Sequence, residues 1–204
     1  PKREYKWSET YKPSPSFVSI HLGVNKELID DKFNCHHIIV ENWDDLESEK
    51  GVIFISIPTL LDPLLAPEGK HIIHAFTPSS MVEWENLSRK DYLLKKQNYF
   101  EFITEKISKI IPNLLNNIDH KEIGTPRTHR KFLGRYEGSY GPIPNKKLLG
   151  LLPMPFNTTN IKNLYCVGDS CFPGQGLNAV AFSGYACAHK IGSKLDLNEF
   201  NLPD

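Results

Sequence analysis

One carboxylate and several glycines stand close together near the end of the chain, in a pattern typical of a ligand-binding loop. Asp169 follows the apolar run 164–167 and Gly168, and Gly174 and Gly176 come a few residues later. Glycine lets backbone approach a ligand closely, and the N–H groups at the start of a helix bind anions. The carboxylate of Asp169 suits a sugar or polyol hydroxyl. The pattern therefore favours a nucleotide-type cofactor, and a tight turn before a well-packed buried helix is the alternative.

A strand and a helix are expected to position this loop. The short apolar run Leu164 to Val167 is typical of a strand buried on both faces. The alanine-rich segment from Leu177 to Ile191 is predicted to be a helix. Its small residues would let it pack close to a neighbour or a flat ring; they are Ala179, Ala181, Ser183, Gly184, Ala186 and Ala188.

Composition excludes some classes of function. The 24 basic and 24 acidic residues balance, so the charge gives no argument for nucleic acid as a partner. No apolar run approaches the roughly 20 residues that a membrane span needs, although peripheral contact with a membrane stays open. The four cysteines lack a paired C-x-x-C spacing, so we expect reduced thiols and no metal site. The chain begins at Pro1 without Met, which suggests a fragment or a trimmed chain.

The first half of the chain is predicted to be rich in strands. After polar residues 1–15, the expected strands are 16–24, 35–40, 52–57 and 71–76. Because no helix separates most of them, an antiparallel or mixed sheet is favoured. Ser88 to Asp91 has the spacing of a capping box and begins a predicted helix that Pro112 ends. Its aromatic and isoleucine stripe, Tyr92, Tyr99, Phe100, Ile103, Ile107, Ile110 and Ile111 with Lys96, is expected to face the core.

Two segments leave alternatives open. In 58–67, three prolines forbid a long helix, so the leucines either fold back onto the core, which we favour, or form a hydrophobic lip for lipid or an apolar substrate. The segment 120–150 mixes basic residues, aromatics and glycines without a clear period, as long functional loops do. Arg127, His129 and Arg130 are either a solvated basic face or groups that orient a cofactor phosphate or a substrate.

Residues along nearly the whole chain carry a resemblance to a known family. The clusters are Ser16–Phe17 with His21–Gly23, Cys35–Val40, Ile57–Pro63, Gly124–Arg130, Gly138–Pro142, Met154–Thr159 and Leu164–His189. In this order they resemble the C-terminal part of the carotenoid cis–trans isomerases, which belong to the phytoene-desaturase-like flavoproteins. Leu177–Asn178 is similar to the cyanobacterial-type members.

The resemblance implies an α+β or α/β fold in two parts. Residues 1–155 would be a portion of a mixed-sheet substrate domain. Residues 156–204 would be the C-terminal strand and helix of a Rossmann-like FAD-binding domain. The dinucleotide fingerprint G-x-G-x-x-G of such enzymes does not occur in the chain. We therefore expect the 204 residues to supply only part of a flavin site and to be inactive by themselves.

Family membership would also imply the chemistry. The reaction would convert poly-cis-lycopene to all-trans-lycopene with reduced FAD and no net redox change, and NAD(P)H is the candidate reductant. The protein would be a plastid or cyanobacterial one, in peripheral contact with a membrane and not secreted. By analogy, the cofactor-binding residues are Gly168, Asp169, Gly174, Gln175, Gly176, Leu177, Asn178 and Ala179.

No catalytic acid, base or nucleophile follows from the sequence. His129 and Tyr140 are the titratable residues of the matched segment that we would test first, with structural roles as the alternative. Two rival functions also remain. One is another flavoenzyme of the same fold, a carotenoid desaturase or a retinol saturase. The other is a non-enzymatic carrier that holds an apolar ligand with its sheet and the leucines 60–65.

Overall fold

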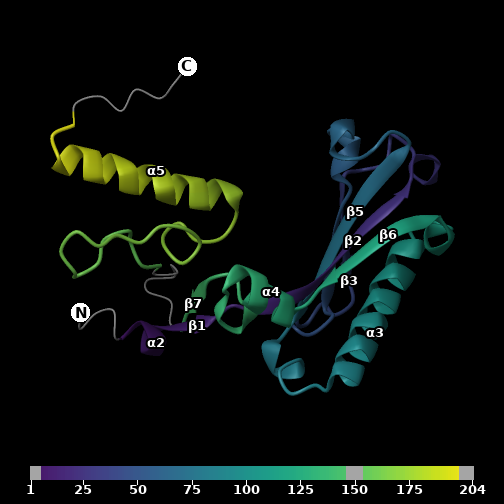
Figure 1. The fold of residues 1–204 in the computed structure, drawn as a ribbon, viewed down its shortest axis with the longest axis horizontal. Coiled ribbons are helices and arrows are strands. Elements are labelled where there is room, and N and C mark those ends of the chain that lie inside the picture. The colour runs from purple at the N-terminus through teal and green to yellow at the C-terminus, as the bar shows by residue number, and fades with distance from the viewer. Residues whose placement is uncertain (1–5, 146–153, 198–204) are drawn as a thin grey trace. The chain divides into compact units, whose positions relative to one another are not determined.

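The chain forms two compact units in a computed structural model that describes residues 6–145 and 154–197 (Figure 1). The sheet unit is Pro15–Ser139, and the loop unit joins Pro1–Ser14 to Tyr140–Asp204. The units therefore divide the chain at positions other than the predicted boundary after residue 155. Their assignment to a substrate domain and a cofactor domain stays a prediction, and residues 146–153, which include the end of the segment 120–150, lie outside the described residues.

A five-stranded antiparallel sheet forms the sheet unit, in the order β3-β4-β5-β2-β6. The strands are β2 (Ser16–Asn25), β3 (His36–Val40), β4 (Val52–Ser56), β5 (Lys70–Ser79) and β6 (Ile118–Gly124). Buried and less buried residues alternate along β5, as expected for a strand with one face on a core. The α+β class and the four predicted strands are confirmed.

Helix α3 (Arg89–Ser108) supplies the second layer, against one face of the sheet (Figure 1). The Ser88 hydroxyl accepts a hydrogen bond from the Asp91 backbone N–H at 3.2 Å and donates one to the Asp91 carboxylate at 2.6 Å. In the usual capping box, a Glu side chain accepts a hydrogen bond from the backbone N–H of the cap residue. The side chain of Asp91 is shorter and instead accepts one from the Ser88 hydroxyl. The predicted core stripe is confirmed, since Tyr99, Ile103 and Ile107 are almost fully buried.

The leucines after β4 do not all fold back onto the core. Two short 3₁₀ turns, Pro58–Leu60 and Pro63–Leu65, hold this loop. Leu60 packs against the core, but Leu61, Leu64 and Leu65 are 75%, 92% and 52% exposed. The favoured interpretation was wrong for these three residues because the prolines fix turns that direct their side chains outward.

Most of the segment 120–150 that the structure describes is regular. Its first residues belong to β6, which pairs with β2, and Pro126–Leu133 form helix α4. Thr125 caps α4 through a reciprocal bond with Thr128, and Gly134 ends the helix in the left-handed conformation (φ 63°). The expectation of an irregular loop was wrong. The start of α4 was not recognised because Thr128 stands where a capping box usually has Glu.

The loop unit contains β1 (Tyr11–Pro13), which follows the short helix α2 (Trp7–Thr10), with β7 (Pro142–Pro144) and α5 (Leu177–Lys194). The predicted helix is confirmed and extends three residues beyond Ile191. The predicted buried strand at 164–167 is wrong: within the described residues, only Tyr165 bridges to Thr158, and Val167 is 55% exposed. A strand buried on both faces needs paired neighbours, which the described part of the loop unit does not provide.

Candidate functional site

The glycine-rich loop before α5 has the backbone that the sequence predicts. Gly168, Gly174 and Gly176 have φ angles of 107°, 120° and 103°. L-residues rarely adopt this region, so the loop needs glycine there. A Cβ atom on Gly168 or Gly176 would meet nothing within 4 Å, and one on Gly174 would meet only Met154 at 3.8 Å. The loop therefore leaves open space beside its backbone, as a ligand cradle requires.

The N-terminus of α5 has no side-chain cap. Gly176 is its N-cap and provides no side-chain hydrogen bond. The first backbone N–H groups of a helix have no partner inside it, so those of Leu177, Asn178 and Ala179 are suited to an external acceptor. Leu177 is 83% exposed and Asn178 is exposed as well.

Hydrogen bonds of Asn157 and Ser183 connect the glycine-rich loop to α5. The Asn157 side-chain amide donates to the Cys166 carbonyl oxygen at 3.0 Å and to the Ser183 carbonyl and hydroxyl oxygens at 3.2 and 3.0 Å. The Ser183 hydroxyl accepts from the Gly168 N–H at 3.3 Å and is fully buried. These two residues join the segment before the loop to the middle of α5. Sequence reasoning did not single them out as site residues; a serine–glycine pair within an alanine-rich helix was the available signal.

A second glycine segment packs directly against Asp169. A Cβ atom on Gly141 (φ 103°) would lie 2.9 Å from the Asp169 carbonyl oxygen and 3.4 Å from Gln175 Cγ. The structure thus brings the half-buried Tyr140, whose N–H donates to the Ser14 hydroxyl at 3.1 Å, into the loop unit with the candidate cofactor residues. The Asp169 carboxylate accepts a bond from the Ser170 hydroxyl at 3.3 Å.

His129 belongs to the other compact unit, on α4. Its ring is nearly buried and packs on Phe17 with 4.7 Å between centroids. The Ser16 hydroxyl lies 3.5 Å from His129 Nδ1 and donates to the Gly138 carbonyl oxygen at 2.7 Å. Burial lowers the pKa of His129, so the imidazole is neutral at neutral pH. A neutral imidazole can accept a proton. The contacts of His129 with Phe17 and Ser16 also join α4 to the start of β2.

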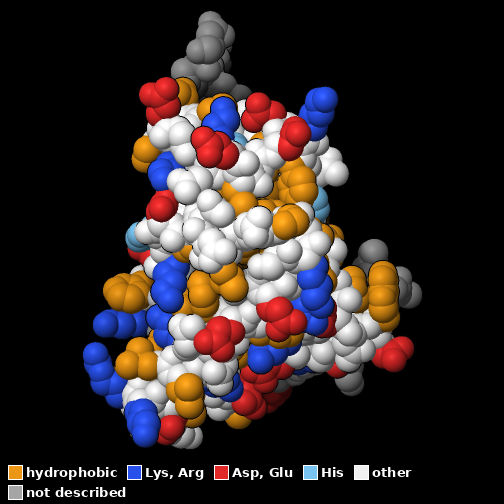
Figure 2. Space-filling model, turned by 90° about the vertical axis from the view of Figure 1, so that its right-hand side faces the viewer, with side chains coloured by type: hydrophobic (Ala, Val, Ile, Leu, Met, Phe, Trp, Pro, Cys, Tyr) orange, Lys and Arg blue, Asp and Glu red, His pale blue; other side chains and the backbone are white. Residues whose placement is uncertain are grey.

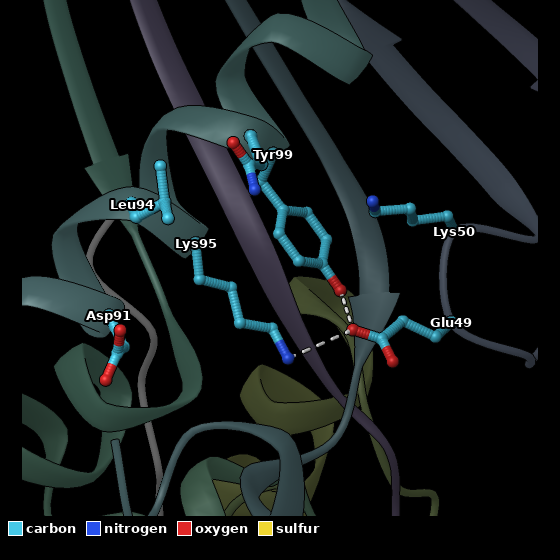
Figure 3. Close-up of a pocket in the computed structure, with 7 residues that line it drawn as sticks. Glu49, Lys50, Asp91, Leu94, Lys95 and Tyr99 are labelled. Carbon is cyan, nitrogen blue, oxygen red and sulfur yellow. Dashed lines mark hydrogen bonds and ion pairs between the residues drawn. The ribbon is translucent and has the colours of Figure 1, made fainter. Parts of the chain in front are cut away.

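A pocket of about 500 Å³ lies beside α3, away from any predicted site residue (Figure 3). The Tyr99 hydroxyl donates to the Glu49 carboxylate and lies 3.1 Å from the Ser79 hydroxyl, while Lys95 lies 3.8 Å from Glu49. Burial and the bond to Glu49 raise the pKa of Tyr99, so its phenol stays protonated. This network connects α3 to the residues before β4.

The described residues contain neither a cluster of metal-ligating side chains nor a helix able to cross a membrane. Burial, followed by the charges of Cys166, Cys187 and Asp169, raises the pKa of the Cys171 thiol to about 11. That thiol is therefore not a reactive nucleophile at neutral pH. Figure 2 shows basic and acidic side chains interspersed over one face of the molecule, without a field of one sign.

Comparison with known proteins places the chain beside the carotenoid isomerases. It is 51% identical over 201 residues to a chloroplastic prolycopene isomerase of Arabidopsis thaliana, covering 98% of this chain and 34% of that protein. A second chloroplastic prolycopene isomerase, from an Oncidium hybrid cultivar, is 54% identical over 197 residues, covering 96% of this chain and 34% of its own length. The resemblance to the prolycopene isomerases is thereby confirmed over nearly the whole chain, which spans about a third of the length of these curated relatives.

More distant relatives are oxidoreductases of other kinds. A 4,4'-diaponeurosporene oxygenase of Staphylococcus haemolyticus is 26% identical over 91% of this chain and 38% of its own length. A solved oxidoreductase from Methanosarcina mazei is similar over 95% of this chain and 37% of its own, with a TM-score of 0.47 and 16% identity. No family model matches the chain.

Proposed function

We propose that this chain is part of a carotenoid cis–trans isomerase that converts poly-cis-lycopene to all-trans-lycopene with reduced FAD. The identity of 51–54% to prolycopene isomerases over 96–98% of the chain carries the proposal. Desaturases, retinol saturases and the carrier are less well supported, because the relatives with other carotenoid activities are only 26–27% identical. The chloroplastic relatives also favour a plastid location.

The glycine loop fits a flavin. Gly168 and Gly176 leave room beside the backbone, and the N-terminus of α5 has no side-chain cap. The partial positive charge of that helix end would favour the anionic form of reduced flavin by about 0.3–2 kcal/mol. Asp169 would accept a hydrogen bond from a hydroxyl of the ribityl region, and the backbone of Gly174, Gln175 and Gly176 would lie along the cofactor. Bound there, reduced FAD would supply the electron donation that changes double-bond geometry without net oxidation.

A chimera tests the activity. The chain would replace the matching segment of the Arabidopsis relative, and the purified chimera would be given FAD, a reductant such as NAD(P)H and poly-cis-lycopene without oxygen. We expect all-trans-lycopene of unchanged mass. A product lighter or heavier by two hydrogens would instead identify a desaturase or a saturase. His129→Ala and Tyr140→Phe in the same chimera test the two catalytic candidates, and full activity of either variant removes that residue.

The separate 204-residue chain is expected to bind FAD weakly, because it lacks the dinucleotide fingerprint. Flavin titration followed by fluorescence measures this affinity. Micromolar or tighter binding by the chain alone would contradict the expectation that these 204 residues supply only part of the flavin site.

Peripheral membrane contact is proposed for the exposed leucines after β4. Leu61, Leu64 and Leu65 present apolar surface to solvent on a proline-fixed loop. Sedimentation with phosphatidylcholine vesicles would measure contact, and replacing all three leucines by serine should release the protein into the supernatant. Equal binding of the serine variant would place membrane contact elsewhere.

A further inference from the structure

A pocket with a strongly basic lining lies in the sheet unit, and we call it the basic pocket. It has a volume of about 720 Å³ and is lined by residues of α3, β6 and α4. Five of its nine lining residues are cationic and none is acidic; the cationic ones are Arg89, Lys96, Arg127, Arg130 and Lys131. Because like charges repel, an anion bound among these side chains would lower their electrostatic energy.

Two cations of the basic pocket are half-buried and have no carboxylate partner among the described residues. The guanidinium carbon of Arg127 lies 4.8 Å from the centroid of the Tyr92 ring, and Lys96 Nζ lies 5.7 Å from the same centroid. The ion pairs of the described chain include neither of these two side chains, whereas Arg130 pairs with Glu85 at 2.9 Å. A charge that is withdrawn from water is normally paired, so a ligand would supply the missing negative charge.

Hydrogen bonds between α3 and the start of α4 hold the two cations in place. The Tyr92 hydroxyl lies 3.0 Å from the Thr125 hydroxyl, and the Thr125 hydroxyl accepts a bond from the Thr128 N–H at 3.4 Å. Tyr92 is therefore fixed to the first turn of α4, next to Arg127, while Lys96 follows Tyr92 by one turn of α3. Side chains that are positioned before a ligand arrives lose less conformational entropy on binding, which favours affinity.

The donors of the basic pocket match a phosphate group. A guanidinium offers a planar fork of N–H donors that bonds two phosphate oxygens, and a lysine ammonium adds a point charge. A phosphate carries up to two negative charges and three strong acceptor oxygens, so it can engage several cations at once. A single-stranded nucleic acid would instead need a basic groove that follows its backbone, together with rings for successive bases.

We propose that the basic pocket binds a phosphate group, with Arg127 and Lys96 as its main ligands. A lipid headgroup and a soluble phosphate compound share this chemistry, and the experiment below distinguishes them. Phe132 lines the same pocket and is 72% exposed, so it would contact the part of the ligand next to the phosphate. The inference goes beyond the proposed function and does not rest on it, because neither the polyene nor the glycine loop enters the argument.

Calorimetric titration of the complete 204-residue chain with inorganic phosphate tests the soluble source. Sodium chloride would keep the ionic strength constant, so that screening does not change during the titration. Arg127→Gln removes the guanidinium fork and should weaken phosphate binding about tenfold. Lys96→Gln removes one charge and should weaken it about fivefold.

Lys109→Gln is the matched control. Lys109 is exposed at the opposite end of α3, outside the basic pocket, and its variant changes the net charge equally but should bind like the parent chain. Circular dichroism and urea midpoints should show that all variants fold. Arg127→Lys keeps the charge and loses only the fork, so it should bind between the parent and Arg127→Gln, and it tests the pocket even where Arg127→Gln fails to fold.

Sedimentation with vesicles tests the lipid source. The readout is the binding gained when phosphatidylcholine vesicles are replaced by vesicles of equal parts phosphatidylcholine and phosphatidylglycerol. A gain that falls in Arg127→Gln and Lys96→Gln, without calorimetric binding of phosphate, identifies a lipid headgroup. Variant-sensitive binding of phosphate without such a gain identifies a soluble phosphate compound, and either result supports the basic pocket. No binding by the parent chain in both assays, or binding that these variants and Arg127→Lys leave unchanged in both, would overturn the proposal.

Discussion

Asn157 connects the segment before the candidate cofactor loop to α5. Its amide reaches the carbonyl of Cys166 before the loop and both oxygens of Ser183 in α5. Alanine at this position would leave these acceptors without their donor while the adjoining backbone remains partly buried.

The Asn157→Ala variant should therefore loosen the loop locally. A loss of about 1–2 kcal/mol of local stability corresponds to roughly tenfold faster amide exchange at Gly168 and its neighbours. Hydrogen exchange followed by mass spectrometry measures this in peptides spanning 164–172. Asn98→Ala, on the exposed side of α3, is the control and should leave these peptides unchanged. Unaltered exchange in Asn157→Ala would show that the loop is held by other contacts.

Individual residue types were enough to predict the glycine loop, because glycine at a position of positive φ has a direct physical reason. The support from Asn157 and Ser183 was not predictable. Their hydrogen bonds join positions 26 residues apart, and no local pattern encodes such a pair. Likewise, Tyr140 and His129 stand close in sequence but belong to different compact units.

At the scale of elements, the turn after α4 is fixed by a close backbone approach. Gly138 has φ 65°, and a Cβ there would lie 2.5 Å from the Pro126 carbonyl oxygen. Gly134 has a similar φ of 63°, but a Cβ there would meet nothing within 4 Å. Comparing variants at these two glycines therefore separates the cost of left-handed backbone strain from the cost of a steric collision.

Alanine at Gly134 should cost about 1 kcal/mol of unfolding free energy, from left-handed strain alone. Alanine at Gly138 adds the collision and should cost about 3 kcal/mol, with a shift of the Ser16 hydroxyl that contacts His129. Urea unfolding of both variants measures the difference. Equal destabilisation would mean that the Pro126 backbone moves aside freely.

Three histidines of the sheet unit make its stability depend on pH. Burial lowers the pKa of His71, His74 and His129; Lys26 adds to the effect at His71, where Asp31 opposes it, and His21 adds to it at His74. Because the folded state disfavours their charged forms, their contribution is complete above the ordinary pKa of about 6.5. It is lost as the pH falls through the lowered folded-state values.

We therefore expect the urea midpoint to fall between pH 7 and pH 5, before most carboxylates titrate. His74→Gln should reduce the slope. A midpoint that stays constant or rises on acidification would contradict the effect of burial.

The elements themselves were largely predictable where the pattern is local. Alternation along β2 and β5, and the Ser88 cap with its isoleucine stripe, indicated strands and helix correctly. Helix α4 was missed because its eight residues are mostly basic and polar, and its cap uses Thr128. The apolar run 164–167 gave a wrong strand prediction, because such a run forms a buried strand only where neighbouring strands pair with it.

At the scale of the whole molecule, the loop unit is built from both ends of the chain. Tyr11, Lys12 and Pro13 pair with Pro144, Ile143 and Pro142, and the Ser14 N–H donates to the Gly141 carbonyl oxygen at 3.0 Å. Gly141 in turn packs on Asp169. No local sequence pattern indicated this closure, because its partners are separated by the complete sheet unit.

Removing residues 1–14 should therefore loosen the loop unit and spare the sheet unit. We expect about tenfold faster amide exchange around Gly141 and Asp169, since the strand pairing and the Ser14 bonds are lost. Peptides from the buried side of α3, 97–107, should keep their protection. Faster exchange in α3 as well would show that the two units are stabilised jointly.

The pairing of β1 with β7 also sets the order in which the two units can fold during synthesis. β1 leaves the ribosome before the sheet unit, and β7 follows only after it; the core of the sheet unit is contained between residues 15 and 139. Since domains fold as units while the chain grows, the sheet can close around α3 while β1 still has an unpaired edge. A nascent chain arrested before residue 142 would hold a folded sheet beside a free strand, and the loop unit is the last part of this chain to mature.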